Sequence, residues 1–373
     1  MSTHLKKLKL YIVSNMYPSS EDAYYGVFVK NFCNSIIGSP QIKIVSTSFI
    51  RGRGTSFLSK LNRYFKFYTS ILFKSLFFNY DIIYVHNVSH SILPLYPVLL
   101  KRLFSKIRII INPHGEDMVI THKIDGILLS LSLPFIRKAD QIVVPSLYYG
   151  NLIAKLYNLN PKKIFISPSG GIDLSVFKVL ETKRFVNVQE KNIGFISRID
   201  PDKGWDVLLN AIAILVAFDE FKSLKATFVG KGTDVDRFLK LVDILKLSDH
   251  VEYLGFKSQI QLPEIINKFD VFVFPTKMRE SLGLVGLESM ACGVPVIASD
   301  QGGMSDYVKD GVNGFTFKCG DHLSLSGVLK NFFNLSTEEV LDMKKNALET
   351  AEVFSSNNVK NNMIANLISI KNK

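Results

Sequence analysis

Short apolar runs recur along the whole chain, and most are followed by a stretch with helical periodicity. Runs of this length between turn signals are typical of buried strands, and their alternation with helices indicates βαβ units. The pattern therefore predicts the α/β class, with parallel sheets covered by helices. The predicted strands are Leu8–Ser14, Ile42–Thr47, Ile82–His86, Ile107–Asn112, Gln141–Pro145, Ile164–Pro168, Ile193–Ser197, Ala226–Gly230, Val251–Leu254, Asp270–Pro275, Val294–Ser299 and Gly314–Phe317.

The length of the chain indicates two domains. Its 373 residues are too many for one typical domain and suit two α/β domains of about 175 residues each. The apolar signal dips at residues 177–191, which we take as a linker between domains of residues 1–176 and 192–354. Ligands of doubly wound sheets bind beyond the carboxyl ends of the strands, so we expect two such domains to face each other across a cleft.

An acidic corner follows the predicted strand Asp270–Pro275. Glu280 lies in the next loop, and Glu288 lies in a predicted helix that ends at a Gly and a Pro. Ser281 is the expected N-cap, which would direct the backbone N–H groups at 282–284 (Leu282, Gly283 and Leu284) toward an anion. A ligand with phosphates at the helix end and hydroxyl groups at the two carboxylates fits this corner, and a nucleotide sugar has that shape. Taken singly, each Glu is also typical of a solvated helix or of a favourable helix dipole interaction.

A basic loop follows the predicted strand Ile193–Ser197. Arg198 leaves the carboxyl edge of that strand, and Lys203 precedes the Gly that opens the next helix. Two cations fixed beyond the strand ends could neutralise a diphosphate leaving group, and one preorganised donor of this kind is worth roughly 3–4 kcal/mol. Without a second motif, the same residues would be an ordinary surface Arg and a helix-start Lys.

Together, the acidic corner and the basic loop resemble the E-x7-E and G-x-S/T-R-x4-K-G patterns of the retaining glycosyltransferase family 4, in particular those of bacterial surface polysaccharide assembly (O-antigen, capsule, exopolysaccharide). The resemblance implies the GT-B fold, with two Rossmann-like doubly wound parallel-sheet domains and a C-terminal helix, residues 355–373, that crosses back to the first domain. It also implies that Glu288 holds the ribose and Glu280 the transferred sugar, with Arg198 and Lys203 on the diphosphate. Leu282 stands where the family often has Phe.

Three further positions match the family less fully. His114 follows a predicted strand in an H-G-x-D pattern, which implies a catalytic His on the reacting face of the sugar, although a lone His is more often structural. Gly26 matches the loop that closes over the diphosphate and the acceptor. Phe256 stands where the family places the nucleotide base. Two D-x-D triplets, Asp200–Asp202 and Asp234–Asp236, could hold a divalent ion in another fold, but we interpret both as structural and expect no required metal or other cofactor.

Positive charge is concentrated in the first half of the chain. Residues 1–175 contain 21 Lys and Arg and 8 Asp and Glu, a net charge of +13, whereas the rest has a net charge of −1. This imbalance favours an acidic partner. Residues 56–78 have a basic amphipathic helical pattern, which could lie on an anionic membrane surface or pack on a sheet with a cationic outer face. We expect no nucleic acid partner, because no nucleic-acid-binding motif accompanies the charge.

The cysteine content and hydropathy bear on localisation. Cys33, Cys292 and Cys319 are odd in number and far apart, which favours reduced thiols in a cytosolic protein. No secretory signal or membrane-spanning run is predicted. With the basic first half, this predicts a cytoplasmic protein associated peripherally with the inner face of the plasma membrane.

The predicted function is retaining transfer of a hexosyl residue from a UDP- or GDP-sugar to a glycan acceptor, linked to a polyprenyl diphosphate. The sugar, the base, the acceptor linkage and the oligomeric state stay open at this level. Two other functions are weighed: a GT-B-fold sugar-nucleotide epimerase, disfavoured by the E-x7-E helix, and a non-catalytic partner subunit, disfavoured by the intact charged residues.

Overall fold

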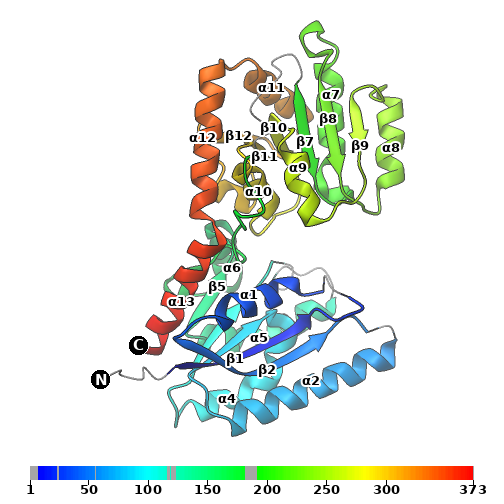
Figure 1. Ribbon diagram of the computed structural model, residues 1–373. Helices are drawn as coiled ribbons and strands as arrows, with labels where there is room; N and C mark the ends of the chain where they lie inside the picture. The colour runs from blue at the N-terminus through cyan, green and yellow to red at the C-terminus, as the bar shows by residue number, and fades with distance from the viewer. Residues whose placement is uncertain are drawn as a thin grey trace. The chain divides into compact units, whose positions relative to one another are not determined.

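The computed structural model describes residues 7–22, 25–54, 56–115, 118, 123–180 and 191–372. The chain forms two compact units, one of residues 1–170 with 357–373 and the other of residues 171–356 (Figure 1). Each unit is an α/β sandwich around one parallel sheet. None of the helices in the described part of the chain is long and apolar enough to cross a membrane.

The first unit contains a six-stranded parallel sheet in the order β2-β1-β3-β4-β5-β6. Its strands are β1 (Leu8–Tyr17), β2 (Ile42–Arg51), β3 (Ile82–His86), β4 (Arg108–Asn112), β5 (Gln141–Val144) and β6 (Ile164–Ile166). Its helices are α1 (Val27–Ile37), α2 (Phe57–Phe77), α3 (Val88–Ser91), α4 (Tyr96–Lys101), α5 (Lys123–Lys138), α6 (Leu147–Tyr157) and α13 (Ser356–Asn372).

Alternate residues of the first sheet enter two cores, as expected for strands that are buried on both faces. On one face, strand residues pack with Phe67 of α2, Phe135 of α5 and Ile153 of α6. On the other face they pack with Cys33 of α1 and Leu367 of α13. The chain therefore returns to its first unit through α13, which completes the cover of that face.

The second unit contains a six-stranded parallel sheet in the order β12-β11-β10-β7-β8-β9. Its strands are β7 (Asn192–Ile196), β8 (Lys225–Val229), β9 (Val251–Tyr253), β10 (Val271–Phe274), β11 (Val296–Ser299) and β12 (Gly314–Phe317). Its helices are α7 (Trp205–Leu215), α8 (Val235–Ile244), α9 (Leu262–Ile266), α10 (Leu284–Ala291), α11 (His322–Phe333) and α12 (Thr337–Val353).

Each sheet has one point at which the strand order reverses. In the first sheet β1 lies between β2 and β3, and in the second β7 lies between β8 and β10. At such a point the loops after two adjacent strands lead to opposite faces of the sheet, which leaves a crevice at the carboxyl edge. The loops after β7 and β10 contain Arg198, Lys203 and Glu280, so the topology itself brings these residues together.

The predicted strands are all present, with ends that differ by a few residues. The first unit ends at Gly170 in the structure, whereas the sequence predicts a boundary at residue 176. Residues 171–180 belong to the second unit, where Phe177 is buried in the core with Met290 and Ala347. Of the predicted linker at 177–191, residues 181–190 lie outside the described residues. The predicted C-terminal helix begins at Ser356.

Candidate active site

The loops after β7 and β10 are held against each other at the switch point of the second sheet. The backbone N–H of Lys277 donates to the carbonyl of Asp202 at 2.8 Å. Gly204, with φ +73°, passes so close to Pro275 that a Cβ atom would lie 1.8 Å from the Pro275 carbonyl oxygen. Only glycine combines this left-handed backbone with such a close approach. The contact fixes the short helix η5 (Pro201–Lys203) beside the acidic loop.

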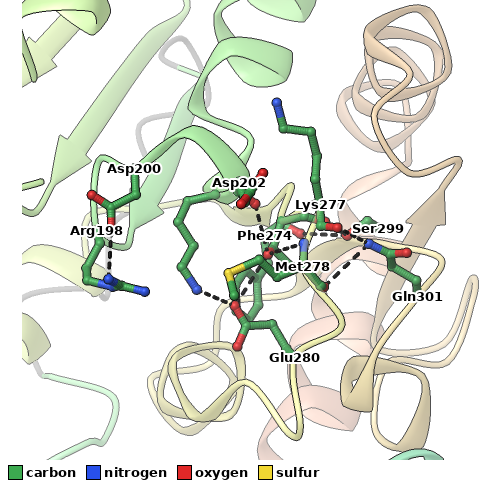
Figure 2. Close-up of polar contacts among 11 residues, drawn as sticks. Arg198, Asp200, Asp202, Phe274, Lys277, Met278, Glu280, Ser299 and Gln301 are labelled. Atoms are coloured by element: carbon green, nitrogen blue, oxygen red, sulfur yellow. Dashed lines mark hydrogen bonds and ion pairs between the residues drawn. The ribbon is translucent and has the colours of Figure 1, made fainter. Parts of the chain in front are cut away.

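Lys203 and Glu280 form a largely buried ion pair in this corner. The Lys203 Nζ atom lies 2.5 Å from Glu280 Oε1, and the exposed fractions of the two side chains are 10% and 21%. The hydroxyl group of buried Thr276 lies 3.3 Å from the same carboxylate oxygen. Figure 2 shows Glu280 next to Met278 in the loop that carries it. The structure thus brings Lys203 and Glu280 together, while their role in ligand binding stays a prediction.

Arg198 stands at the open side of the corner. Its side chain is 62% exposed and pairs with Asp200 at 2.7 Å (Figure 2). Asp200 also accepts hydrogen bonds from the backbone N–H and hydroxyl group of Thr233. These bonds, the Thr233 backbone N–H first among them, and the nearby Arg198 lower the pKa of the Asp200 carboxyl. Asp200 is thus occupied within the chain, while the exposed guanidinium of Arg198 keeps donors for an anionic ligand.

The loop that carries Glu280 is held by hydrogen bonds from the end of β11 and from the segment that follows it. The backbone N–H of Gly303 donates to the Glu280 carbonyl at 2.8 Å. Gln301 donates to the Lys277 carbonyl at 2.7 Å, and Ser299 donates to the Thr276 carbonyl at 2.7 Å (Figure 2). These bonds hold the backbone from Thr276 to Glu280. The segment after β11 is therefore a scaffold for the loop that carries Glu280.

The helix that carries Glu288 begins later than predicted. α10 starts at Leu284 and its N-cap is Gly283, with φ +83° and no side-chain cap. The prediction of Ser281 as the N-cap is wrong, because the buried Leu282 turns inward to pack in the core before the helix begins. Of the three predicted N–H groups, those of Gly283 and Leu284 lie at the helix N-terminus, and that of Leu282 precedes it.

Glu288 lies in the second turn of α10 and accepts a hydrogen bond from Gln259 at 3.2 Å. Burial raises the pKa of Glu288 to about 7, and the Gln259 hydrogen bond opposes that rise. The buried hydroxyl group of Tyr307 donates to the Gly283 carbonyl at 2.8 Å. Burial, followed by the negative charges of Glu280 and Glu288, raises the pKa of Tyr307. The negative charges of both carboxylates of the predicted E-x7-E motif therefore act on one buried tyrosine.

Phe256 lies in the same unit, after β9. Its ring is 54% exposed, and the Lys231 ammonium group lies 4.9 Å from the ring centroid. Lys231 belongs to the turn after β8, whose Gly230 accepts a hydrogen bond from Tyr253. An exposed aromatic ring beside a cation offers a stacking surface for a flat, electron-rich group. The base-binding role that the sequence implies for Phe256 stays a prediction.

In the first unit, His114 follows β4 and pairs with a second histidine. His86 Nδ1 lies 2.9 Å from His114 Nε2, and the Phe28 ring packs on His114 with the centroids 4.1 Å apart. Burial lowers the pKa of His114 to about 3, and burial together with His114 lowers the pKa of His86 as well. Both imidazoles are therefore neutral at physiological pH. The two histidines line a pocket with Phe28, Phe32, Asn112 and Lys360.

The buried environment of His86 selects the tautomers of this pair. His86 is 1% exposed, and its Nε2 atom has no hydrogen-bond partner. A buried N–H without a partner is rarer than an unpaired acceptor. The favoured arrangement is therefore His86 Nδ1–H donating to His114 Nε2, which leaves His114 protonated on Nδ1.

Gly26 is the N-cap of α1, next to the switch point of the first sheet. It has φ +71°, and a Cβ atom there would lie 2.5 Å from the Met16 carbonyl carbon. The turn therefore needs glycine, as the predicted glycine-bearing loop requires. Residues 23–24, and Asp117 of the predicted H-G-x-D pattern, lie outside the described residues.

The predicted site residues fall into two groups. His114 and Gly26 belong to the first unit, and Arg198, Lys203, Leu282, Gly283, Leu284, Glu288, Glu280 and Phe256 belong to the second. Sequence reasoning missed His86, Thr276 and Tyr307. His86 and Thr276 each stand at the end of a predicted strand, where a polar residue after an apolar run could have marked them. Among the described residues there is no group of three His, Cys, Asp or Glu that could hold a metal ion.

Similar folds occur among solved structures. HepE from Anabaena, solved with UDP, superposes with a TM-score of 0.71 at 18% identity and covers 97% of this chain and 100% of that one. Sucrose-phosphate synthase from Thermosynechococcus elongatus gives a TM-score of 0.73 at 17% identity, with 98% and 99% covered. With two Rossmann-like parallel sheets, this chain is of the GT-B class. Models of "Glycosyltransferase Family 4" and "Glycosyl transferases group 1" match residues 23–175 and 178–350, so the chain belongs to glycosyltransferase family 4.

Relatives in sequence carry one recurring name. The D-inositol 3-phosphate glycosyltransferase of Stackebrandtia nassauensis is 30% identical over 206 residues, which are 52% of this chain and 46% of that protein. The chain spans about half the length of the curated relatives it matches.

Proposed function

We propose that this protein is a retaining glycosyltransferase that transfers a hexosyl residue from a nucleoside-diphosphate sugar to a glycan acceptor. The observation that carries the proposal is the largely buried Lys203–Glu280 pair at the switch point of the second sheet, beside the exposed Arg198. A cation held at low exposure next to a carboxylate suits a ligand that brings both a diphosphate and sugar hydroxyl groups.

In the proposed reaction, the diphosphate binds at Arg198, Lys203 and the N-terminus of α10. The ribose hydroxyl groups donate to Glu288, and those of the transferred sugar donate to Glu280. As the anomeric carbon–oxygen bond breaks, negative charge grows on the diphosphate, and the two cations stabilise it. Preorganised donors at a developing charge contribute roughly 3–4 kcal/mol each. The acceptor oxygen attacks the same face of the sugar, and its proton passes to the departing diphosphate.

The family pattern assigns three further contacts to this reaction. Phe256 borders the base, and Gly26 approaches the diphosphate or the acceptor. His114 forms a hydrogen bond with the transferred hexose. We propose that none of these steps requires a metal ion, so transfer should persist in the presence of EDTA. UDP-sugars are the first donors to test, because HepE, which shares the fold, was solved with UDP and with UDP-glucose.

The proposed acceptor is linked to a polyprenyl diphosphate in bacterial surface polysaccharide synthesis, at the cytoplasmic face of the plasma membrane. Two observations support a membrane contact. Residues 1–175 carry the excess positive charge. In addition, α2 exposes large apolar side chains, among them Leu61, Phe65 and Phe77, with exposed fractions of 59%, 68% and 72%. A basic helix with exposed aromatic side chains suits an anionic headgroup layer.

A thermal shift and hydrolysis panel tests the proposal. UDP-glucose, UDP-galactose, UDP-N-acetylglucosamine and GDP-mannose would each be added to the protein, and the melting temperature and release of nucleoside diphosphate measured. One donor at about a hundred times its Kd should stabilise the fold by about 2.7 kcal/mol.

Variants extend the same panel. Arg198→Ala and Glu280→Ala should abolish turnover of that donor, whereas Lys277→Met, which breaks the more exposed pair of Lys277 with Asp206 of α7, should retain it. Full activity in both Ala variants would overturn the proposed site. An absence of any shift across the panel would overturn nucleotide-sugar binding.

A further inference from the structure

A basic groove runs between strand β2 and helix α2 in the first unit. It has a volume of about 440 Å³, and its lining includes the cationic side chains of Arg51, Arg63, Lys66 and Lys74. Among the residues that the structure describes, none of those lining the groove is acidic. Four cations around one cavity repel each other, and an anion that enters the groove would offset this repulsion.

Two of the four cations are fixed in place by the backbone. Lys74 Nζ donates to the Thr47 carbonyl at 2.7 Å, and Arg63 donates to the carbonyls of Arg51 and Gly52 at 2.7 and 3.0 Å. Burial lowers the pKa of Lys74. These bonds hold the side chains but provide no negative charge. Their consequence is a rigid, cationic wall on the α2 side of the groove.

The other wall is the edge of the sheet. β2 is the terminal strand in the order β2-β1-β3-β4-β5-β6, so its outer side faces the groove and not another strand. An edge strand presents unpaired N–H and C=O groups. Lys74 and Arg63 already occupy the carbonyls of Thr47 and Arg51 on this strand, and their side chains and those of Arg51 and Lys66 supply N–H donors to the groove. A donor-rich, cationic groove selects an anion with several acceptor oxygens, and a phosphate group has that chemistry.

The surface next to the groove indicates where the phosphate comes from. Lys66, Ser70, Phe73 and Phe77 follow the i, i+4, i+7, i+11 spacing of one helix face. Lys66 and Ser70 line the groove, while Phe73 and Phe77 are 56% and 72% exposed, with ring centroids 4.9 Å apart. A cationic groove that continues into an exposed aromatic pair matches the boundary between the headgroups and the acyl chains of a bilayer.

We propose that the groove between β2 and α2 binds the phosphate of an anionic phospholipid headgroup. Arg51, Lys66 and the fixed Lys74 neutralise the phosphate, and Phe73 and Phe77 enter the interfacial layer beside it. The inference rests on the proposed membrane contact of α2 and adds to it a defined lipid site. It does not depend on the donor or on the reaction.

Vesicle binding of the full chain tests this site. The probe is a phosphatidylcholine vesicle with or without about one third phosphatidylglycerol. The test variant is Arg51→Gln with Lys66→Gln, because neither side chain donates to the backbone bonds described above. The matched control is Lys155→Gln with Lys162→Gln, which removes the same charge near the opposite edge of the sheet, where both residues are exposed.

The groove variant should lose about thirtyfold in affinity for the anionic vesicles, since each basic group near an anionic surface contributes roughly fivefold. The control should change less than twofold. Equal losses in both variants would overturn the site and leave only diffuse attraction. The lipid assignment would be overturned if calorimetry showed that the wild-type protein binds inorganic phosphate, that the groove variant does not, and that the wild-type protein does not bind the anionic vesicles. A wild-type protein that binds neither probe would overturn the whole inference, while turnover of a soluble acceptor would leave the proposed function intact.

Discussion

Removing the charge of Lys203 should destabilise the second unit far more than removing the charge of Lys277 in the same corner. Both lysines pair with a carboxylate, Lys203 with Glu280 at 2.5 Å and Lys277 with Asp206 at 3.0 Å. The first pair has side-chain exposed fractions of 10% and 21%, and the second has 32% and 38%. The comparison therefore separates the effect of burial from the effect of pairing.

The magnitudes follow from this difference. Breaking a fully buried pair costs about 3–5 kcal/mol, because one charge is left without a partner. Glu280 keeps some solvent contact and the Thr276 hydroxyl, so we expect Lys203→Met to lower the free energy of unfolding by about 2–4 kcal/mol. Lys277→Met should cost about 0–1 kcal/mol, as exposed pairs do. Lys203→Met with Glu280→Gln should be more stable than Lys203→Met alone, since the unpaired carboxylate is then gone.

Urea unfolding measures these free energies. It can be followed by the fluorescence of Trp205, which is the first residue of α7 in the second unit. Turnover of the preferred donor should fall about a hundred- to a thousandfold in Lys203→Met, which corresponds to the loss of one preorganised donor. Free energies within about 0.5 kcal/mol of each other for the two Lys variants would refute the argument from burial. A double variant less stable than Lys203→Met would refute the account of the unpaired charge.

Three further predictions concern single residues. The raised pKa of Glu288, about 7 in the folded state against about 4.5 in the unfolded state, means that the folded state binds the extra proton in this range. Its contribution to stability is therefore present below about pH 4.5 and is lost as the pH rises through 7. The gain in free energy of unfolding of Glu288→Gln over wild type should therefore be larger at pH 8 than at pH 5, by about 2–3 kcal/mol. Parallel pH profiles of wild type and variant in urea unfolding would contradict this. His86→Phe should release the Nδ1–H tautomer of His114, seen in ¹⁵N chemical shifts, and reduce kcat about tenfold with little change in UDP affinity, whereas His90→Phe should leave the His114 signals unchanged. Gly204→Ala should cost at least about 3 kcal/mol or prevent folding, while Gly320→Ala, with φ +75° and no atom within 4 Å of the added Cβ, should cost about 1 kcal/mol; similar losses in both would count against the close contact with Pro275.

The regular part of the fold follows from local patterns that sequence carries. Apolar runs such as Ile82–His86 are buried on both faces of a sheet, so their composition marks them regardless of their surroundings. The corner that joins Lys203 and Glu280 was also predictable, because motifs at the ends of two strands meet wherever those strands are neighbours.

Other features depend on tertiary contacts that no local pattern shows. Ser281 has the chemistry of an N-cap, but the burial of Leu282 moves the helix start to Gly283. Similarly, the sequence around Phe177 resembles a linker in composition, whereas its side chain is buried in the second core. The partner of His114 comes from a strand 28 residues earlier in the chain. Each of these depends on which distant side chains meet.

Glycine opens α1, α7 and α10, the helices that follow Gly26, Gly204 and Gly283, and none of the three has a side-chain cap. α2, α6, α11 and α12, which start elsewhere, are capped by their own Ser or Asp side chains. A glycine cap costs only a few tenths of a kcal/mol relative to a serine cap, because water replaces the missing oxygen. The first amides of these three helices therefore receive no hydrogen bond from a side chain of their own cap. A ligand that accepts hydrogen bonds from these helix ends does not first have to displace a side-chain cap, and the chain gives up very little stability for this.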